Sequence, residues 1–360
     1  MAGIQSLSCQ RVEFALVPPL ENAQGNWRER ATLELRLQDA AGRHGCGEAA
    51  PLPGYSCDSL DACEATLRAI PIDRLVALSE LSAPSELLRA ANDLIPRSVP
   101  AARFALETAL LDRLGRTLGR PLWSLLREAL GEPLGTPAPS PLELCALLPS
   151  GSPASALSVA RRHVDQGVRH FKVKIGPEQL QPMQWTLLDA LRSRLGAVCT
   201  LRLDANRSLS RARLPADLRR LAAYQPEFIE EPVAEPAPLD FADSPCPLAL
   251  DESLQSLDSA QLVALVSLPS CRALVLKPTT LGGFSRCSAL AGRARAFGKA
   301  VIVSHTFEGP IGWLACAHLA LALAPGPASG LWPASHQVPS DWLENGRLQA
   351  LQRPGLGREA

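Results

Sequence analysis

The 360-residue sequence has no long hydrophobic run and no excess of charge of either sign. Its longest apolar stretches, such as Trp313 to Leu323, contain a histidine and are well short of a membrane span. Lys plus Arg and Asp plus Glu number 36 each, so the formal net charge of zero supplies no basic field to hold nucleic acid or an anionic membrane. We therefore expect a small-molecule partner, with no nucleic-acid partner and no membrane partner.

Three further absences narrow the class of protein. The N-terminus MAGIQSLSCQRVEF lacks a basic segment followed by an apolar run, so we expect no secretory signal and a cytoplasmic location. The ten cysteines are scattered without CxxC spacing, which favours reduced, buried thiols over metal ligands. No glycine-rich phosphate loop of the GxGxxG or Walker type is present. The 46% hydrophobic content is enough for a large core or two adjoining ones.

The first part of the chain predicts an α+β domain. Gln5 to Leu16 and Ala31 to Gln38 alternate apolar and polar residues, and Gly45 to Pro51 follows a turn, so we expect an antiparallel meander. Helical periodicity follows, most clearly over Ala101 to Leu118. The Pro/Gly-rich stretch Glu132 to Pro141 is the predicted linker. This first domain is expected to cover residues 1–136.

After the linker, strands and helices alternate over residues 137–339. This alternation predicts an α/β domain built as a (β/α) barrel rather than an open sheet. Seven strands are expected, with a weaker eighth near Gly330 to Trp332: Leu142 to Leu148, His170 to Ile175, Thr200 to Ala205, Glu227 to Glu231, Leu248 to Asp251, Ala273 to Lys277 and Lys299 to Ser304.

Several of these strands end in charged residues. The motifs are FKVKIG from Phe171, LRLDAN from Leu201, FIEEP from Phe228, LALDES from Leu248 and ALVLKP from Ala273. Parallel strands gather these ends at one rim of a barrel, where three carboxylates between lysines would make a site for a hard cation such as Mg²⁺, with acid/base groups beside it.

Strand parity assigns some of these side chains but not all. Lys172 and Lys174 share a face, and the repulsion between two buried ammonium groups lowers a lysine pKa toward neutrality. Asp204 shares its face with Arg202 and Asn206. Adjacent residues face opposite ways, so parity does not decide which of Glu230 and Glu231, or which of Asp251 and Glu252, points into the site. Lys277 ends the strand expected to lie across the barrel from the lysine pair, as a second cation or base.

These residues resemble the enolase superfamily and, within it, the muconate-lactonizing subgroup with its KxK motif. The resemblance runs nearly end to end and implies a modified, TIM-like (β/α) barrel with an N-terminal α+β capping domain. A C-terminal segment, about residues 340–360 and including LQALQRPGLG from Leu348, would rejoin that cap. By this likeness Lys174 is the acid/base, with Lys172 beside it and Lys277 opposite. The implied ligands of Mg²⁺, which Mn²⁺ can replace, are Asp204, Glu230 and Asp251.

The capping-loop motif GCGEAAPLPGYS, from Gly45 to Ser56, and the motifs LRLDAN and VLKPTTLGG are similar to those of one group of dehydratases in this subgroup. The resemblance therefore implies a carbon–oxygen lyase of menaquinone biosynthesis. Its reaction is the syn dehydration of 2-succinyl-6-hydroxy-2,4-cyclohexadiene-1-carboxylate to o-succinylbenzoate. The candidate contacts to this carboxylate substrate are Pro53, Tyr55, Ser56, Arg202, Asn206, Ser304 and His305.

His305, in SHTFEGP, departs from the expected pattern, because this likeness would more often have serine there. We interpret His305 as a polar residue at the lip of the site, since Lys277 already takes the opposing position. The alternative activity is racemisation of an N-acylamino acid or epimerisation of a dipeptide by the same two lysines, against which VLKPTTLGG argues mildly. The sequence leaves the oligomeric state open.

Overall fold

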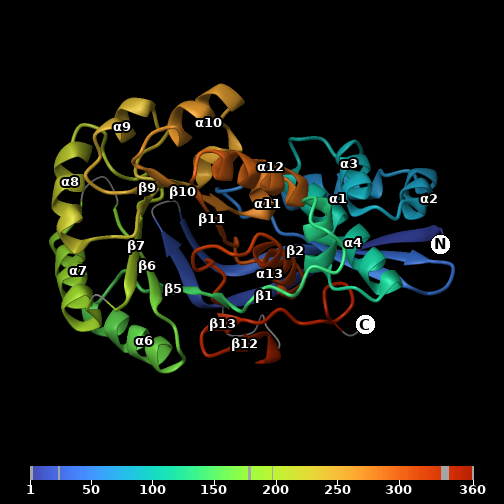
Figure 1. The fold of residues 1–360 in the computed structure, drawn as a ribbon, viewed down its shortest axis with the longest axis horizontal. Helices are drawn as coiled ribbons and strands as arrows, with labels where there is room; N and C mark the ends of the chain where they lie inside the picture. Colours follow the sequence, from blue (N-terminus) through green and yellow to red (C-terminus); the bar gives the residue numbers. More distant parts are fainter. Residues whose placement is uncertain (1–2, 23–24, 177–179, 197, 334–339, 359–360) are drawn as a thin grey trace.

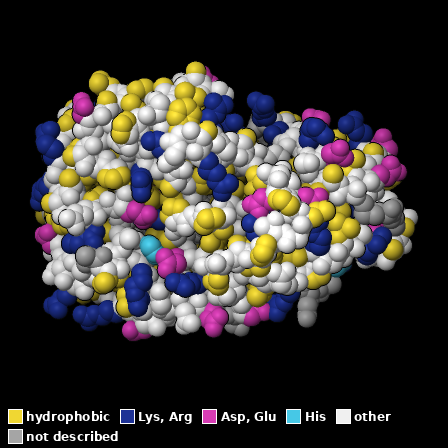
Figure 2. Space-filling view, in the orientation of Figure 1, with side chains coloured by type: hydrophobic (Ala, Val, Ile, Leu, Met, Phe, Trp, Pro, Cys, Tyr) yellow, Lys and Arg dark blue, Asp and Glu magenta, His cyan; other side chains and the backbone are white. Residues whose placement is uncertain are grey.

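The structure of the chain is a computed structural model that describes residues 3–22, 25–176, 180–196, 198–333 and 340–358. A curled parallel sheet with its outer helices lies to the left in Figure 1, and most of the N-terminal helices lie to the right. No helix in the described ranges is long and apolar enough to cross a membrane. On the face in Figure 2, Lys and Arg side chains are spread among Asp and Glu side chains, and no broad patch of one sign is visible.

The N-terminal sheet is the predicted antiparallel meander. It runs in the order β1 (Ile4–Asn22), β2 (Gly25–Asp39) and β3 (His44–Ala49). It packs against the long helix α4 (Pro100–Leu118) so closely that a Cβ at Gly47 would lie 1.9 Å from the Ala105 carbonyl oxygen. Only glycine permits this approach. The other helices of this region are α1 (Leu60–Arg68), α2 (Ile72–Glu80), α3 (Pro84–Asn92) and α5 (Leu122–Ala129).

Seven parallel strands form the second sheet, and each pairs with the next along the chain, in the order β11-β10-β9-β8-β7-β6-β5. The strands are β5 (Cys145–Leu148), β6 (His170–Lys174), β7 (Thr200–Asp204), β8 (Ile229–Glu230), β9 (Leu248–Leu250), β10 (Cys271–Leu276) and β11 (Ala300–Val303). The helices between and after them are α6 (Pro153–Asp165), α7 (Pro182–Leu195), α8 (Leu214–Leu221), α9 (Pro238–Ala242), α10 (Ser259–Val266), α11 (Pro278–Leu281), α12 (Gly283–Ala296) and α13 (Pro310–Ala322).

The expected eighth strand is reduced to two bridging residues. Ser329 pairs with Leu144 and Gly330 pairs with Ser304, both in parallel, so this segment joins the two edges of the sheet. The Gly330 amide donates to the Val303 carbonyl at 2.8 Å. A Cβ at Gly330 would lie 2.7 Å from Ser304 Oγ, which explains why a glycine stands here. We call residues 329–330, where the two edges of the sheet meet, the seam of the barrel. The fold is therefore the predicted α/β barrel with an N-terminal sheet domain. Two bridging residues close the barrel in place of the expected eighth strand near Gly330 to Trp332.

The C-terminal segment contacts both parts of the molecule. Its strands β12 (Leu343–Glu344) and β13 (Arg347–Leu348) form a small sheet with β4 (Leu142–Glu143), and Figure 1 shows the chain then running back toward the N-terminal helices. There the Leu356 amide donates to Asp112 Oδ1 at 2.7 Å. The division into 1–136 with 340–360, and 137–339, stays a prediction, and parts of these ranges lie outside the described residues.

Two buried acids of the N-terminal region bind the starts of barrel helices. Glu48 on β3 accepts from the amides of Gly309 and Gly312, at 2.5 and 2.9 Å, where α13 begins. Glu107 on α4 accepts from the Phe284 amide at 2.5 Å, where α12 begins. Carboxylates satisfy the unpaired N–H groups of a helix start and complement its dipole. These contacts attach the N-terminal domain to the barrel beside the ends of β10 and β11.

Candidate active site

The ends of the parallel strands bring most of the predicted charges into one pocket. Its lining includes Lys172 and Lys174 from β6, Asp204 from β7, Glu230 from β8 and Lys277 after β10. The chain has only four lysines, and three of them lie here. Because parallel strands all end at the same rim, residues far apart in the sequence become neighbours.

Lys172 joins two of the acids. Its Nζ lies 2.9 Å from Asp204 Oδ2 and 2.7 Å from Glu230 Oε1, whereas Val173 between the two lysines is buried on the other side of the strand. Burial lowers the pKa of Lys172, but Asp204 and Glu230 outweigh it, so the net pKa is raised. The same contact with Lys172, together with the other lysines, outweighs burial at Asp204 and lowers the pKa of that carboxyl.

Lys174 differs from its neighbour because it has no such partner. Within the described residues its ammonium group makes no hydrogen bond or ion pair, although its side chain lines the pocket. Burial lowers its pKa to about 8, and the positive charges of Lys172 and Lys277 add to this while Asp204 opposes it. The sequence predicts a lowered pKa for one member of a buried lysine pair, and in the structure burial is the larger cause. Lys174 is therefore the pocket lysine best suited to accept a proton near neutral pH.

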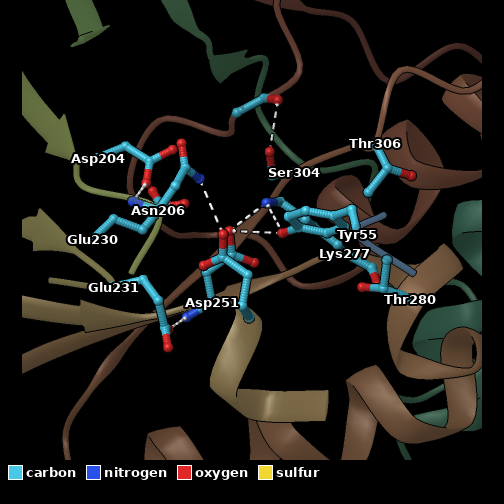
Figure 3. Close-up of polar contacts among 12 residues, drawn as sticks. Tyr55, Asp204, Asn206, Glu230, Glu231, Asp251, Lys277, Thr280, Ser304 and Thr306 are labelled. Atoms are coloured by element: carbon cyan, nitrogen blue, oxygen red, sulfur yellow. Dashed lines mark hydrogen bonds and ion pairs between the residues drawn. The ribbon is translucent and has the colours of Figure 1, made fainter. Parts of the chain in front are cut away.

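Lys277 is held by an acid and by the capping loop. Its Nζ contacts Asp251 Oδ2 and donates a hydrogen bond to the Tyr55 hydroxyl at 2.6 Å. The same Nζ lies 4.8 Å from the centroid of the Tyr55 ring. These contacts restrict the ammonium group to one position. Tyr55 also donates to Asp251 Oδ2 at 3.3 Å, as Figure 3 shows. Burial lowers the pKa of Lys277, but the surrounding carboxylates outweigh it and raise the pKa overall. The loop of the N-terminal domain thus reaches the strand-end charges directly.

The structure separates Glu230 from Glu231. Glu230 lines the pocket, whereas Glu231 accepts from the Asp251 amide at 2.7 Å and the Ser253 amide at 3.1 Å. The backbone of Glu231 has φ of 44°, so the chain has left the regular strand and turned this side chain toward the next loop. Burial raises the pKa of Glu230 to about 8, with Lys172 opposing and the neighbouring acids adding to the rise.

Asp251 and Glu252 are both buried but have different partners. Asp251 contacts Lys277 and accepts a hydrogen bond from the Tyr55 hydroxyl. Glu252 Oε1 accepts a hydrogen bond from the side-chain Nδ2 of Asn206 at 3.0 Å. The backbone N–H of Asn206 donates to Asp204 Oδ1 at 2.9 Å. Lys172 therefore joins Asp204 to Glu230, Lys277 binds Asp251, and Asn206 is hydrogen-bonded to both Asp204 and Glu252.

The donor set of these acids suits a hard divalent cation. Asp204, Glu230 and Asp251 are three buried carboxyl groups at the ends of successive strands, and carboxylate oxygens are the ligands that Mg²⁺ prefers. Across the described part of the chain, no three His, Cys, Asp or Glu side chains converge so as to hold a metal ion as they stand. Lysine ammonium groups lie against all three acids instead. The three carboxyl groups are therefore the right type of ligand for Mg²⁺, and the lysine ammonium groups balance the negative charge that a bound Mg²⁺ would also balance.

The other predicted contacts are divided between the pocket and its surroundings. Arg202, Ser304 and His305 line the pocket, but the Arg202 guanidinium is engaged by Glu227 and by the Ala328 carbonyl. Ser304 Oγ donates to the Gly330 carbonyl at 3.2 Å, across the seam. Burial lowers the pKa of His305, so its neutral form is favoured, and its Nδ1 lies 3.7 Å from Glu308 Oε2.

Pro53 and Ser56 lie in the capping loop but not on the pocket lining. The Pro53 carbonyl accepts from Trp27 Nε1 at 3.0 Å, and Ser56 Oγ accepts from the Leu52 amide at 2.9 Å. Both contacts shape the loop that carries Tyr55.

Several lining residues were not predicted from the sequence. Phe228, Val275 and Ile302 each stand two positions before a pocket residue, namely Glu230, Lys277 and Ser304, so the alternation that selected the charges could also have found them. Phe307 and Trp332 follow the strands in loops, where no periodicity indicates them. Together they add apolar surface to the pocket, and Phe228, Val275 and Ile302 belong to one buried apolar cluster.

Comparison with known proteins gives matches along nearly the whole chain. Residues 6–127 match the mandelate racemase / muconate lactonizing enzyme N-terminal domain, and residues 155–360 match the enolase C-terminal domain-like family. An o-succinylbenzoate synthase of Thermosynechococcus vestitus is 31% identical over 88% of this chain and 89% of its own length. An N-succinylamino acid racemase of Thermus thermophilus is 30% identical over 88% of this chain and 82% of its own.

Among solved structures, a dipeptide epimerase from Methylococcus capsulatus complexed with Mg and the dipeptide L-Arg-D-Lys is similar with a TM-score of 0.80. It is 27% identical, and the match covers 99% of each chain.

Proposed function

Because the chain belongs to the enolase superfamily, and within it to the mandelate racemase / muconate lactonizing enzyme family, we propose that it is an o-succinylbenzoate synthase. The proposed reaction is the Mg²⁺-dependent syn dehydration of 2-succinyl-6-hydroxy-2,4-cyclohexadiene-1-carboxylate. The observation that carries this choice is the inequality of the pocket lysines. Lys172 and Lys277 are paired with acids, whereas Lys174 has no hydrogen-bond or ion-pair partner among the described residues. One base beside fixed cations is what a dehydration on one face of a ring requires.

Lys174 performs both proton transfers in this proposal. Its neutral amine removes the proton alpha to the ring carboxylate, and negative charge then moves onto that carboxylate. The resulting Lys174 ammonium returns the proton to the hydroxyl group as it leaves, on the same face of the ring. The product is aromatic, and water is released. The lowered pKa of Lys174, about 8, supplies the neutral amine, and the ammonium of Lys172 beside it favours that form.

Lys277 contributes charge rather than proton transfer. Asp251 and Tyr55 hold its ammonium in the pocket, where it can lie against the ring and stabilise the developing negative charge. Asp204, Glu230 and Asp251 are the residues that would hold Mg²⁺, which when bound supplies positive charge beside the substrate carboxylate. The apolar residues Phe228, Val275 and Ile302 exclude water beneath the ring.

The test is to incubate purified protein with the cyclohexadiene substrate and Mg²⁺ and to follow o-succinylbenzoate by its absorbance. We expect turnover that EDTA abolishes and Mg²⁺ restores. Lys174→Ala should retain the fold, by circular dichroism, and lose all but a trace of activity. No turnover by the unmodified protein, or full activity in EDTA, would refute the assignment.

The second candidate is racemisation of an N-succinylamino acid or epimerisation of a dipeptide, since relatives with those names match this chain. It is favoured by the presence of Lys174 and Lys277 in the same pocket, because two bases on opposite faces can invert a carbon. In deuterium oxide, exchange of the alpha proton of both enantiomers would support it. Exchange of one enantiomer only, lost in Lys174→Ala and retained in Lys277→Ala, would leave Lys174 as the sole base.

A further inference from the structure

One buried cation near the site has no role in the chemistry above. Arg30 lies on β2 of the N-terminal sheet and is 1% exposed. Among the described residues its guanidinium makes no bond to a carboxylate; it donates to four backbone carbonyls. A buried arginine retained to bind carbonyl oxygens fixes backbone geometry, because its planar group presents donors in set directions.

The four carbonyls belong to two different segments. Arg30 Nη2 and Nη1 donate to Ala50 and Pro51 at 2.6 and 2.9 Å, in the part of the capping-loop motif that directly follows β3. Nε donates to Phe307 at 3.2 Å and Nη2 to Thr306 at 3.4 Å, in the loop after β11. A single side chain therefore joins the capping loop to the rim of the barrel.

Both segments reach the pocket, one through a contact with a lining residue and the other through a lining side chain. The first leads to Tyr55, whose hydroxyl reaches Lys277, and the second contains Phe307, which lines the pocket. Leu52, Tyr55 and Phe307 also pack in the same small apolar cluster. The backbone of Phe307 has φ of 60°, a conformation that side chains rarely adopt, and the hydrogen bond from Arg30 to its carbonyl helps to hold it.

We propose that Arg30 is a positioning residue that fixes the capping loop against the β11 loop and thereby sets substrate affinity. It touches neither the lysines nor the acids, so it acts through the placement of Tyr55 and Phe307. No hydrogen bond among the described residues joins Arg30 to Lys172, Lys174 or Lys277, so we expect the geometry of the lysines to survive its removal. Loss of Arg30 should therefore weaken binding more than it slows the chemical step.

The kinetic experiment compares Arg30→Met, Arg30→Lys and a matched control, Arg192→Met. Arg192 also donates to backbone carbonyls, those of Gly196, Cys199 and Gln225, but lies at the far end of the barrel strands. We expect Arg30→Met to raise KM by about tenfold while kcat stays within about threefold, and Arg30→Lys to recover part of the loss. Arg192→Met should lower stability and leave KM unchanged. An unchanged KM in Arg30→Met, or a fall in kcat alone, overturns the proposal.

Hydrogen exchange tests the same role without any substrate. The amides of Tyr55 and Ser56 both donate to the Leu52 carbonyl, so peptides over residues 50–59 report the loop. In Arg30→Met we expect faster exchange in 50–59 and 304–309 together. In Ser56→Ala, which removes the bond that Ser56 Oγ accepts from the Leu52 amide, exchange should rise in 50–59 alone. Independent or unchanged exchange of the two segments overturns the proposal.

The kinetic arm rests on the proposed function, and the exchange arm does not. If the unmodified protein forms no o-succinylbenzoate, the proposed function fails while exchange still decides the role of Arg30. If Arg30→Met does not fold, Arg30→Lys decides both arms, with a smaller rise in KM and in exchange expected. A folded Arg30→Lys that matches the unmodified protein in both overturns the proposal.

Discussion

The pKa of Lys174 offers the sharpest test of the site, and the perturbation is pH. In the structure this pKa is lowered from 10.5 to about 8. At pH 7 roughly one molecule in ten would then carry the neutral amine, against about one in three thousand at the ordinary pKa. We therefore expect log(kcat/KM) to rise with pH and to level off near pH 8, because the free base is the reactive form.

The same lowering affects stability. Burial disfavours the charged form of Lys174 by on the order of 3 kcal/mol. The unfolded chain binds the proton more tightly than the folded chain between pH 8 and 10.5, so this contribution makes the folded state more stable as pH rises through that window. Lys174→Met should remove this rise from the pH dependence of urea unfolding.

A direct measurement is practical because the chain has only four lysines. With ¹³Cε-lysine labelling, each gives its own signal, and Lys174→Arg identifies the one of interest. Lys172→Met should raise the midpoint, because it removes a positive charge from beside Lys174 and leaves Asp204 without its partner. A midpoint of Lys174 above about 10 in the unmodified protein would refute the reasoning about burial and like charge.

Three further predictions follow from contacts around the site. Glu230→Gln should weaken Mg²⁺ binding, measured by calorimetry, by about tenfold or more, whereas Glu231→Gln should change it by no more than about twofold. Glu231→Gln should instead lower the free energy of unfolding by about 2 kcal/mol, because it disturbs the hydrogen bonds from the Asp251 and Ser253 amides. Equal effects of the two variants on Mg²⁺ binding would contradict the separate roles of Glu230 and Glu231. Tyr55→Phe keeps the ring beside Lys277 and removes the hydroxyl, so kcat/KM should fall by about tenfold without a change in unfolding, and no fall would show that this contact is unused. Burial raises the pKa of Glu107 to about 7, opposed by its hydrogen bonds, so between pH 4.5 and 7 the folded state keeps a proton that the unfolded state has lost. Stability should therefore fall as pH rises through that window, and Glu107→Gln should reduce the fall in urea unfolding.

Much of the site could be predicted because strand geometry is regular. The face shared by Lys172 and Lys174, and the gathering of Asp204 and Glu230 at one rim, follow from a side-chain period of two and from parallel pairing. The same rule fails at the last residue of a strand. Glu231 leaves the strand with a positive φ, so the choice between it and Glu230 depends on a turn that parity does not describe.

Other features depend on contacts that leave no pattern in the sequence. Arg30 is an ordinary arginine in an alternating strand, and its partners are backbone carbonyls, which every residue has. Arg202 is expected near the substrate and does line the pocket, but its guanidinium is bound by Glu227, from the segment just before β8. The eighth strand was weak in the sequence because only Ser329 and Gly330 are needed to bridge the edges.

The seam at Ser329 and Gly330 has a consequence for the order in which the chain can fold. Strands β5 to β11 pair in sequence order, so each can join the sheet as soon as it leaves the ribosome. Ring closure must wait for residues 329–330, and the bond from Leu356 to Asp112 must wait longer still. A chain that folds while it is synthesised would hold an open sheet with two unpaired edges until residues 329–330 emerge, and such edges can pair with those of another chain.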